Sequence, residues 1–341
     1  MSTDSVTMPK RVDAFLDACD SHGWKLLAAA VVVGLVLPFV GLQEGFIMTT
    51  VMDMLLFGVL ALSWDLIGGQ TGYSSFGNMA FFGIGGYTTA ILTKQFGVTV
   101  PVAFLVAGLL AVAFAAVIGL IVLRLRGHYF AIATLGVLLA VQQVSRNLDI
   151  TGGASGIILL ETPSQTTFYY VFLGLLAVEA AVVYYLSATR FGFVLNAIRD
   201  DEEKATAMGF NTTYYKTAAW MLAALFTGFI GAVWSLENGF IEPSSAYNSA
   251  WNVELIAMAL IGGTGSVAGP IIGAFGLHGL IVIVGSVAVG WQLVLLGVAV
   301  IVTVILVPKG LVGALREYAD ELEYYRHGGG AAGDEEGGET G

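Results

Sequence analysis

Long apolar runs alternate with short polar segments along most of this chain. A helix needs about 20 predominantly apolar residues to cross a hydrocarbon core about 30 Å thick, and ten runs approach that length. The pattern predicts an all-α, polytopic membrane helix bundle of about ten transmembrane spans, in which 79–93 and 129–147 are the best candidates for broken or re-entrant helices. The ten runs are 26–42, 46–67, 79–93, 97–123, 129–147, 168–188, 217–236, 244–262, 271–289 and 291–307.

Polar and glycine residues interrupt this pattern most strongly over 68–92, GGQTGYSSFGNMAFFGIGGYTTAIL. Irregular polar backbone at membrane depth persists only where protein or a water-filled cavity covers it. Glycine-interrupted segments in a polytopic protein are therefore pointers to a substrate path. We expect Tyr73, Ser74, Asn78 and Tyr87 to contribute to a translocation path or to the kinked packing beside it.

Composition and charge support a multi-pass protein of the cell membrane, surrounded by lipid. Hydrophobic residues make up 57% of the chain and charged residues 11%, and mean hydropathy is +0.82, values typical of a membrane protein. Lys and Arg concentrate in short cytoplasmic loops. Ten crossings from a cytoplasmic N-terminus place every one of the 14 basic residues except Lys94 and Arg146 in the cytoplasm. This agreement predicts that both termini are cytoplasmic.

Three segments follow from the same pattern. Residues 1–25 form a cytoplasmic or interfacial N-terminal segment, 26–313 form the transmembrane domain, and 314–341 form an acidic cytoplasmic tail. Much of the net charge of −11 lies outside the apolar runs. The last residues, 328–341, consist almost entirely of glycine, alanine and acids, so they have little to bury and we expect them to be disordered.

The sequence carries no catalytic motif. The single cysteine, Cys19, excludes an intramolecular disulfide and a cysteine metal cluster, and the four histidines are too scattered to predict a metal site. The glycine-rich stretch 262–270, GGTGSVAGP, lacks the lysine of a phosphate-binding loop. Gly265, Gly269 and Gly273 instead recur every four residues, a spacing that lets membrane helices approach closely. We therefore expect helix packing here and no ATP hydrolysis by this chain.

The longest polar loop is 189–216, and its middle is predicted to be helical. Asp200, Asp201 and Glu202 suit the first turn of a helix, because acids there complement its dipole, and Gly209 suits its left-handed end. Ala205 and Met208, three residues apart, give the helix one apolar side. Such a helix either docks on a partner or is a solvated connector, and Asn211 is placed to cap the next span.

Four acids fall within the apolar runs: Asp53, Asp65, Glu179 and Glu254. An ionisable side chain inside a bilayer is expensive and often functional. These acids either bond to polar neighbours on adjacent helices or take part in transport. A proton-coupled secondary transporter requires at least one of them to titrate.

Several motifs in order resemble the LivM-like family of branched-chain amino acid ABC transporter permeases. The resemblance extends over residues 46–313. Its motifs are GGQTGYSSFGNMAFFGIGGYTTAIL (68–92), LRLRGHYFAIATLG (123–136), TGGASGI (151–157), NAIRDDEEKATAMGF (196–210), MALIGGTGSVAGPIIGA (258–274) and VPKGLVG (307–313).

This resemblance implies a non-catalytic permease subunit of an importer for leucine, isoleucine and valine. It implies a second, LivH-like permease subunit, two cytoplasmic ABC ATPases that bind ATP and Mg, and an external substrate-binding protein; this chain would bind no cofactor and no nucleic acid. Relatives that carry urea or short-chain amides supply an alternative substrate, and a passive channel is a further alternative. Residues 196–210 resemble the ATPase-coupling segment, with Glu202, Ala205 and Gly209 at matching positions. The residues expected to couple are Arg199, Asp200, Asp201, Glu202, Ala205 and Gly209.

Overall fold

The computed structural model describes residues 23–36, 38, 45–159 and 163–287, with single positions at 294, 297, 298, 301 and 310. The predicted tail 314–341, almost all of the N-terminal segment 1–25, and most of the last apolar run 291–307 lie outside the described residues. The longer helices are α2 (Gly23–Val36), α3 (Phe46–Asp65), α5 (Asn78–Phe96), α6 (Val100–Val122), α7 (His128–Asn147), α8 (Gln165–Ser187), α9 (Arg190–Ala207), α10 (Thr212–Glu237), α12 (Ser249–Gly262) and α13 (Ala268–Val287).

Short elements connect these helices. Two single-turn helices, α4 (Gly68–Thr71) and α11 (Pro243–Ala246), precede α5 and α12, and two 3-10 turns, η2 (Asp149–Thr151) and η3 (Gly153–Ser155), follow α7. The strands β1 (Ile157–Ile158) and β2 (Phe240–Ile241) pair antiparallel. The described part of the chain is therefore a helix bundle, as the apolar pattern predicts.

Six described helical segments are long and apolar enough to cross a membrane. They coincide with six of the ten predicted spans. The remaining runs differ: 26–42 contains the 14-residue α2, 79–93 lies in α5, 244–262 is divided between α11 and α12, and 291–307 lies mostly outside the described residues. The count of ten stays a prediction. The six segments are Phe46–Thr71, Val100–Val122, His128–Asn147, Gln165–Ser187, Thr212–Glu237 and Ala268–Gly285.

Helix α5 lies inside the bundle, between α10 and α6. Glycines allow its backbone to touch that of α10: a Cβ at Gly85 would lie 2.0 Å from the Gly228 carbonyl oxygen, and one at Gly231 would lie 2.1 Å from the Phe82 oxygen. Lipid tails are as apolar as leucine, so membrane helices are held together by such close packing more than by exclusion of water. Only glycine fits at these positions.

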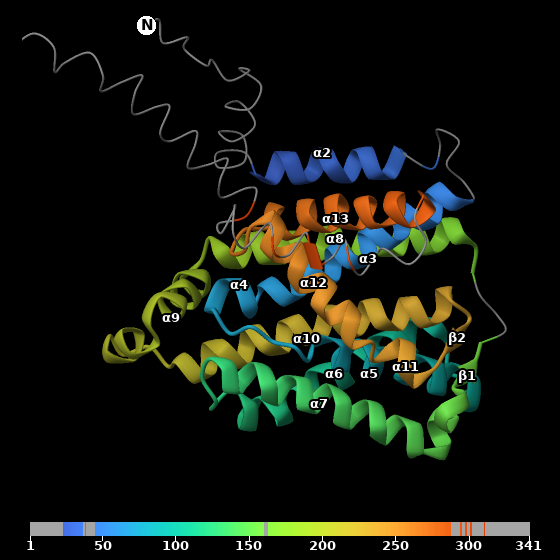
Figure 1. Cartoon of the computed structure of the whole chain (residues 1–341), viewed down its shortest axis with the longest axis horizontal. Helices are drawn as coiled ribbons and strands as arrows, with labels where there is room; N and C mark the ends of the chain where they lie inside the picture. The colour runs from blue at the N-terminus through green and yellow to red at the C-terminus, as the bar shows by residue number, and fades with distance from the viewer. Residues whose placement is uncertain are drawn as a thin grey trace, which may run out of the picture.

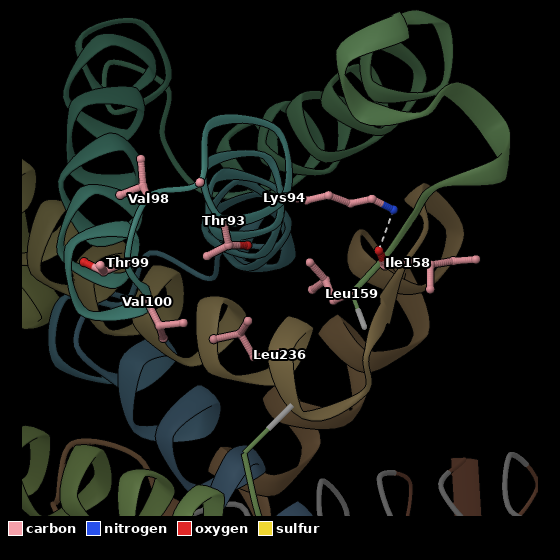
Figure 2. Close-up of a pocket in the computed structure, with 9 residues that line it drawn as sticks. Thr93, Lys94, Val98, Thr99, Val100, Ile158, Leu159 and Leu236 are labelled. Carbon is pink, nitrogen blue, oxygen red and sulfur yellow. Dashed lines mark hydrogen bonds between the residues drawn. The ribbon is translucent and has the colours of Figure 1, made fainter. Parts of the chain in front are cut away.

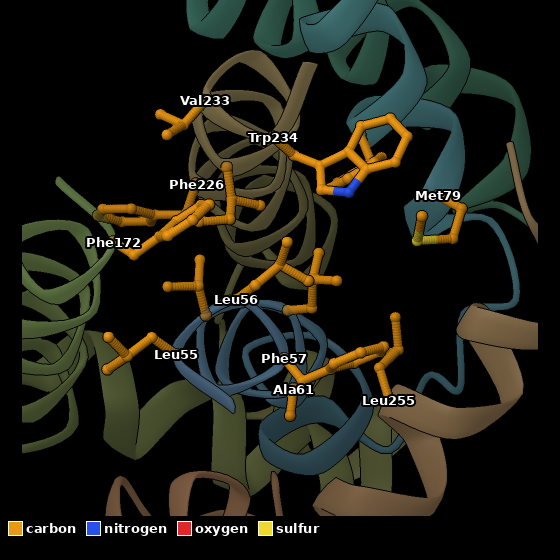
Figure 3. Close-up of a cluster of buried hydrophobic side chains, with 14 of the residues drawn as sticks. Leu55, Leu56, Phe57, Ala61, Met79, Phe172, Phe226, Val233, Trp234 and Leu255 are labelled. Carbon is orange, nitrogen blue, oxygen red and sulfur yellow. The ribbon is translucent and has the colours of Figure 1, made fainter. Parts of the chain in front are cut away.

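The largest apolar cluster surrounds α3 (Figure 3). Leu55, Leu56 and Phe57 of α3 are nearly fully buried. They belong to one cluster with side chains of α8, α10 and α12, so α3 lies at the centre of this cluster. The partners labelled in the close-up include Phe172, Phe226, Trp234 and Leu255.

The irregular segment predicted between the first apolar runs is present over 72–77, between α4 and α5. Protein covers most of it, although Gly72 and Ser74 are exposed. The Trp64 indole N–H donates to the Ser75 carbonyl at 2.8 Å, and the Phe76 N–H donates to Thr134 Oγ1 at 3.0 Å. These bonds satisfy the Ser75 carbonyl and the Phe76 N–H within the protein, as polar backbone at membrane depth requires.

The bundle has two chemically different ends (Figure 1). Helix α9 projects at the left of the view, and β1 and β2 lie at the right. Lys94, one of the two basic residues predicted outside the cytoplasm, donates to the Ile158 carbonyl at the β1–β2 end. Arg126 and Lys216, predicted in the cytoplasm, pair with acids of α9 at the opposite end. The structure thus separates these residues as the charge pattern predicts.

Candidate coupling and transport sites

The α9 arm, defined here as residues 190–211, is the part of the structure that carries the expected coupling residues. Its helix begins at Arg190, earlier than the sequence pattern predicts, because Thr189 Oγ1 accepts the Phe191 N–H at 3.2 Å and caps it. The backbone leaves helical geometry at Asp201, where φ is −165° and ψ is 104°. The arm is therefore two helical halves joined at one extended residue.

Asp201 begins the second half. Its Oδ1 accepts the N–H groups of Glu203 and Lys204, each at 3.0 Å, as an N-cap acid does. Hydrogen bonds from Lys204, first from its backbone and then from its side chain, lower the pKa of Asp201 below its ordinary value. Gly209, with φ at +87°, follows the end of the helix, and Asn211 Oδ1 caps α10 by accepting the Tyr214 N–H at 3.1 Å. The predicted helix start near 200–202, its glycine end and the Asn211 cap are all present.

Glu202 holds the second half of the arm to the bundle. Its Oε1 lies 2.5 Å from Lys216 Nζ, and its Oε2 accepts the hydroxyl of Tyr73. Lys216 Nζ also donates to the Tyr73 hydroxyl at 3.1 Å and lies 4.3 Å from the centre of the Tyr73 ring. We call Glu202, Lys216 and Tyr73 the arm lock. It joins the arm to the beginning of α10 and to the irregular segment after α4.

The electrostatics of the arm lock favour the charged glutamate. Burial raises the pKa of Glu202, but hydrogen bonds from Lys216 and Tyr73 outweigh it, so the pKa lies below its ordinary value. Burial, followed by the bond to Glu202, raises the pKa of Tyr73, which keeps the phenol a donor. Only 4% of the Lys216 side chain and 14% of the Glu202 side chain are exposed. The lock is thus a buried, hydrogen-bonded ion pair.

Arg199 attaches the first half of the arm to a different part of the bundle. Its Nη1 donates to the Gly69 carbonyl of α4 at 3.2 Å. The same guanidinium lies beside Gly265, in the turn before α13, where a Cβ would approach Nη1 to 2.7 Å. Asp65 accepts the Gly265 N–H at 2.9 and 3.0 Å. Arg199 therefore touches the junction of α4 with the turn between α12 and α13.

The other expected coupling residues divide between two faces of the arm. Ala205 is fully buried in an apolar cluster that includes Ile198 and Trp220. Met208 is 61% exposed, so the two do not form the single apolar docking side that their spacing predicts. Asp200 and Gly209 are exposed. The outward face of the arm therefore carries charged side chains together with exposed Phe193 and Met208, and its inward face is apolar.

The four residues expected at the path do not form one site. Tyr73 belongs to the arm lock, and Ser74 is exposed. Asn78 is 1% exposed at the start of α5, and within the described residues neither of its amide atoms has a hydrogen-bond partner. Tyr87 lies nine residues further along α5, about 14 Å along the helix axis; its ring stacks on Tyr247 at 5.9 Å. Their role in transport stays a prediction.

The expected packing glycines lie at the α12–α13 contact. A Cβ at Gly269 would lie 1.9 Å from the Gly263 carbonyl oxygen, and one at Gly273 would lie 1.9 Å from the Met258 oxygen. Gly265 adopts φ +80° in the turn before α13. Two of the three therefore occupy positions of close backbone approach, and the third supplies a left-handed turn.

A pocket of about 510 Å³ opens at the β1–β2 end (Figure 2). Thr93 and Lys94 of α5 line it together with Ile158, Leu159 and Leu236. Lys94 Nζ points toward the Ile158 carbonyl oxygen and donates a hydrogen bond to it at 2.7 Å. Lys94 is the charged side chain among the lining residues, and it is therefore already bonded within the protein. None of the four residues expected at the path lines this pocket.

The four intramembrane acids separate into two kinds. Glu179 accepts the Ser63 hydroxyl at 2.6 Å, and Asp65 accepts the Gly265 N–H, so both bond to neighbours. Asp53 and Glu254 instead converge on His278. The sequence pattern predicts no partner for His278, and it marks Lys216 only as a cytoplasmic charge. A histidine inside an apolar run and a lysine at the edge of one were the available signals.

The sequence is similar to a family of known transport proteins. Residues 46–307 match the family described as branched-chain amino acid transport system, permease component. The chain is similar to the high-affinity branched-chain amino acid transport system permease protein LivM of Salmonella typhimurium, 28% identical over 293 residues that cover 76% of this chain and 68% of that protein. It is similarly 29% identical to LivM of Escherichia coli over 294 residues, which cover 77% and 68%. No solved structure matches. The chain belongs to the branched-chain amino acid transport permease family and is a multi-pass membrane protein.

Proposed function

We propose that this chain is a permease subunit of an ABC importer that moves leucine, isoleucine and valine across the cell membrane. ATP hydrolysis in separate ATPase subunits supplies the energy. The observation that carries the proposal is the α9 arm, which exposes charged side chains together with Phe193 and Met208 while Arg199, Glu202 and Ala205 attach it to the bundle. This arrangement suits an element that receives force from a partner and transmits it to the membrane helices.

The mechanism follows from where the arm is attached. ATP binding closes two ATPases, each ATPase displaces the arm that it contacts, and the bundle exchanges between two packings that open toward opposite sides of the membrane. Arg199 passes the displacement to α4 and to the turn between α12 and α13, and the arm lock passes it to α10. The permease needs only two packings close in free energy that its partners can bias.

The proposal assigns the remaining components to other chains. A second, LivH-like permease subunit completes the path, two cytoplasmic ABC ATPases bind ATP and Mg, and an external binding protein delivers the amino acid. Both LivM relatives are named for branched-chain amino acid transport, which favours these substrates over urea and short-chain amides.

Purification of the assembled complex tests this proposal. We expect two ATPase subunits and a second permease subunit to co-purify with this chain. In proteoliposomes supplied with the binding protein, labelled leucine should be taken up only when ATP is present on the ATPase side. Uptake of urea in place of leucine would favour the alternative substrate. Uptake that follows a proton gradient and ignores ATP depletion would favour a secondary transporter, and non-saturable flux without the binding protein would favour a channel.

A further inference from the structure

Three ionisable side chains from three helices approach one another where α3, α12 and α13 pack together. His278 of α13 lies between Asp53 of α3 and Glu254 of α12, with Nε2 3.9 Å from Asp53 Oδ2 and Nδ1 3.7 Å from Glu254 Oε1. These separations are longer than hydrogen bonds. His278 is 8% exposed, and among the described residues neither ring nitrogen has a hydrogen-bond partner. A buried polar ring without partners, aimed at two carboxylates, indicates that a ligand or water completes the group.

The group lies at membrane depth. Asp53 is seven residues from the start of α3, about 10 Å along its axis, and His278 is ten residues from the start of α13, about 15 Å along its axis. The Asp53 side chain is nevertheless 48% exposed on the surface of the chain. An ionised carboxylate in contact with the hydrocarbon of a bilayer has a large free-energy cost. This face of α3 therefore meets water or another protein subunit, not lipid.

The charge of the group favours a cation. Two carboxylates face one imidazole, so the group stays negative when both acids are ionised, even if the imidazole is protonated. Within the described part of the chain, no set of three or more His, Cys, Asp or Glu residues is arranged to hold a metal ion. An organic cation that brings its own hydrogen-bond donors is the better match.

Aromatic side chains accompany both acids. Phe57 follows Asp53 by four residues on α3, and Trp251 precedes Glu254 by three residues on α12, so each shares a helix face with its acid. The Phe57 ring lies 4.9 Å from the His278 ring and 5.5 Å from the Trp251 ring. Aromatic faces attract ammonium groups and offer apolar contact to an aliphatic side chain. Glu179 and Asp65, by contrast, each accept a hydrogen bond from a neighbouring residue.

We propose that Asp53, Glu254 and His278 form a substrate site in the translocation path, where they bind the ammonium group of an aliphatic amino acid while Phe57 and Trp251 contact its side chain. This inference rests on the proposed function for the identity of the substrate. The existence of a cation site open to water does not depend on it. The two can therefore be tested separately.

Cysteine labelling tests the site without transport. Cys19 is the only cysteine, so Cys19→Ser gives a cysteine-free background for Asp53→Cys in the assembled complex. A cationic methanethiosulfonate should modify this cysteine several times faster than an anionic one, as measured by the intact mass of this chain. Glu254→Gln in the same chain should reduce that preference. Equal rates for the two reagents, or modification only by a lipid-soluble maleimide, would overturn the cation site.

Substrate protection and uptake test the ligand. In the cysteine-free background, Thr50→Cys places a thiol three residues before Asp53 on the same face of α3 and leaves both acids in place. Leucine should slow its modification, whereas 4-methylpentanoate, which lacks the ammonium group, should not. Asp53→Asn and Glu254→Gln should each lower leucine uptake at least tenfold in complexes that assemble and hydrolyse ATP normally. Asp149→Asn, an exposed acid at the β1–β2 end, is the matched control and should change uptake less than twofold.

The outcomes separate the two proposals. Wild-type complex that takes up no leucine contradicts the proposed substrate class, and the charge preference of labelling then still decides whether a cation site exists. Wild-type complex that takes up leucine, combined with unchanged uptake in both acid variants, overturns the site and leaves the importer function in place.

Discussion

Lys216 Nζ and Glu202 Oε1 lie 2.5 Å apart at the point where the α9 arm meets α10. Both side chains are largely buried, and the Tyr73 hydroxyl bonds to both. Removing one member of a buried ion pair leaves an uncompensated charge, which costs about 3 to 5 kcal/mol, whereas replacing both members can be nearly neutral. The position of the arm therefore depends on an ion pair in which loss of either member alone is destabilising.

The first prediction follows from this asymmetry. Lys216→Met should lower the midpoint of thermal unfolding of the purified complex and uncouple ATP hydrolysis from uptake, because Glu202 is left buried and unpaired. Adding Glu202→Gln to Lys216→Met should restore part of the stability. Lys204→Met is the control, since the Lys204–Asp201 pair is exposed and such pairs contribute at most about 1 kcal/mol. A double variant less stable than Lys216→Met alone would contradict the buried pair.

Acid should weaken the arm lock. The pKa of Glu202 lies below its ordinary value of 4.5, so the ionised carboxylate stabilises the folded arm above that value and loses this contribution as the pH falls through its folded pKa. The stability difference between wild type and Glu202→Gln should stay constant from about pH 6 to 8 and narrow below about pH 4.5. Thermal unfolding of both proteins across this range measures it. A difference that grows on acidification would show the opposite shift.

The α12–α13 contact should not tolerate a methyl group at Gly273. A Cβ there would lie 1.9 Å from the Met258 oxygen, whereas a Cβ at Gly276, one turn along the same helix, has nothing within 4 Å. Gly273→Ala should destabilise the protein by about 1 to 3 kcal/mol through overpacking, and Gly276→Ala should be close to neutral. Thermal unfolding in matched detergent compares the two. Equal stabilities would mean that the helices do not approach as described.

Glu179 should be structural. Its Oε1 accepts the Ser63 hydroxyl at 2.6 Å, and a glutamine offers the same acceptor. Glu179→Gln should therefore keep ATP-driven uptake close to the wild-type rate, because the variant retains the side-chain length and the oxygen that accepts the Ser63 hydroxyl. A proton-coupled carrier that used this acid would lose uptake in the variant. Loss of uptake in a normally assembled complex would therefore support a proton-coupled secondary transporter.

Tyr87 offers a test of the predicted path. Its hydroxyl is buried without a hydrogen-bond partner among the described residues, and its ring stacks on Tyr247. Tyr87→Phe keeps the ring and removes only the hydroxyl, so it should leave thermal stability unchanged. We expect slower uptake if the hydroxyl contacts substrate, as we also expect for Asn78→Ala. Normal uptake in both variants would remove these residues from the path.

Local patterns predicted the helices and several of their ends. A bilayer requires an apolar helix of a certain length, so the run 46–67 predicts α3 closely. The Asn211 cap of α10 can also be predicted, because a capping bond joins residues that are close in the sequence. Distant contacts were not accessible in the same way. Tyr73 meets Glu202 across 129 positions, and neither residue carries a local sign of the other. The close contact between the glycines of α5 and the backbone of α10 could not be predicted either, because the spacing of glycines along the chain does not show which helix they meet.

The interruption at Asp201 divides the arm between its two attachments. Arg199, before Asp201, donates a hydrogen bond to Gly69 of α4, and Glu202, after Asp201, pairs with Lys216 of α10. Bending at this single extended residue therefore changes the spacing between two separate membrane helices. In the proposed importer, an ATPase that tilts one half of α9 relative to the other would move the α4 attachment relative to the α10 attachment, so one rotation outside the bilayer would act on two membrane helices at once.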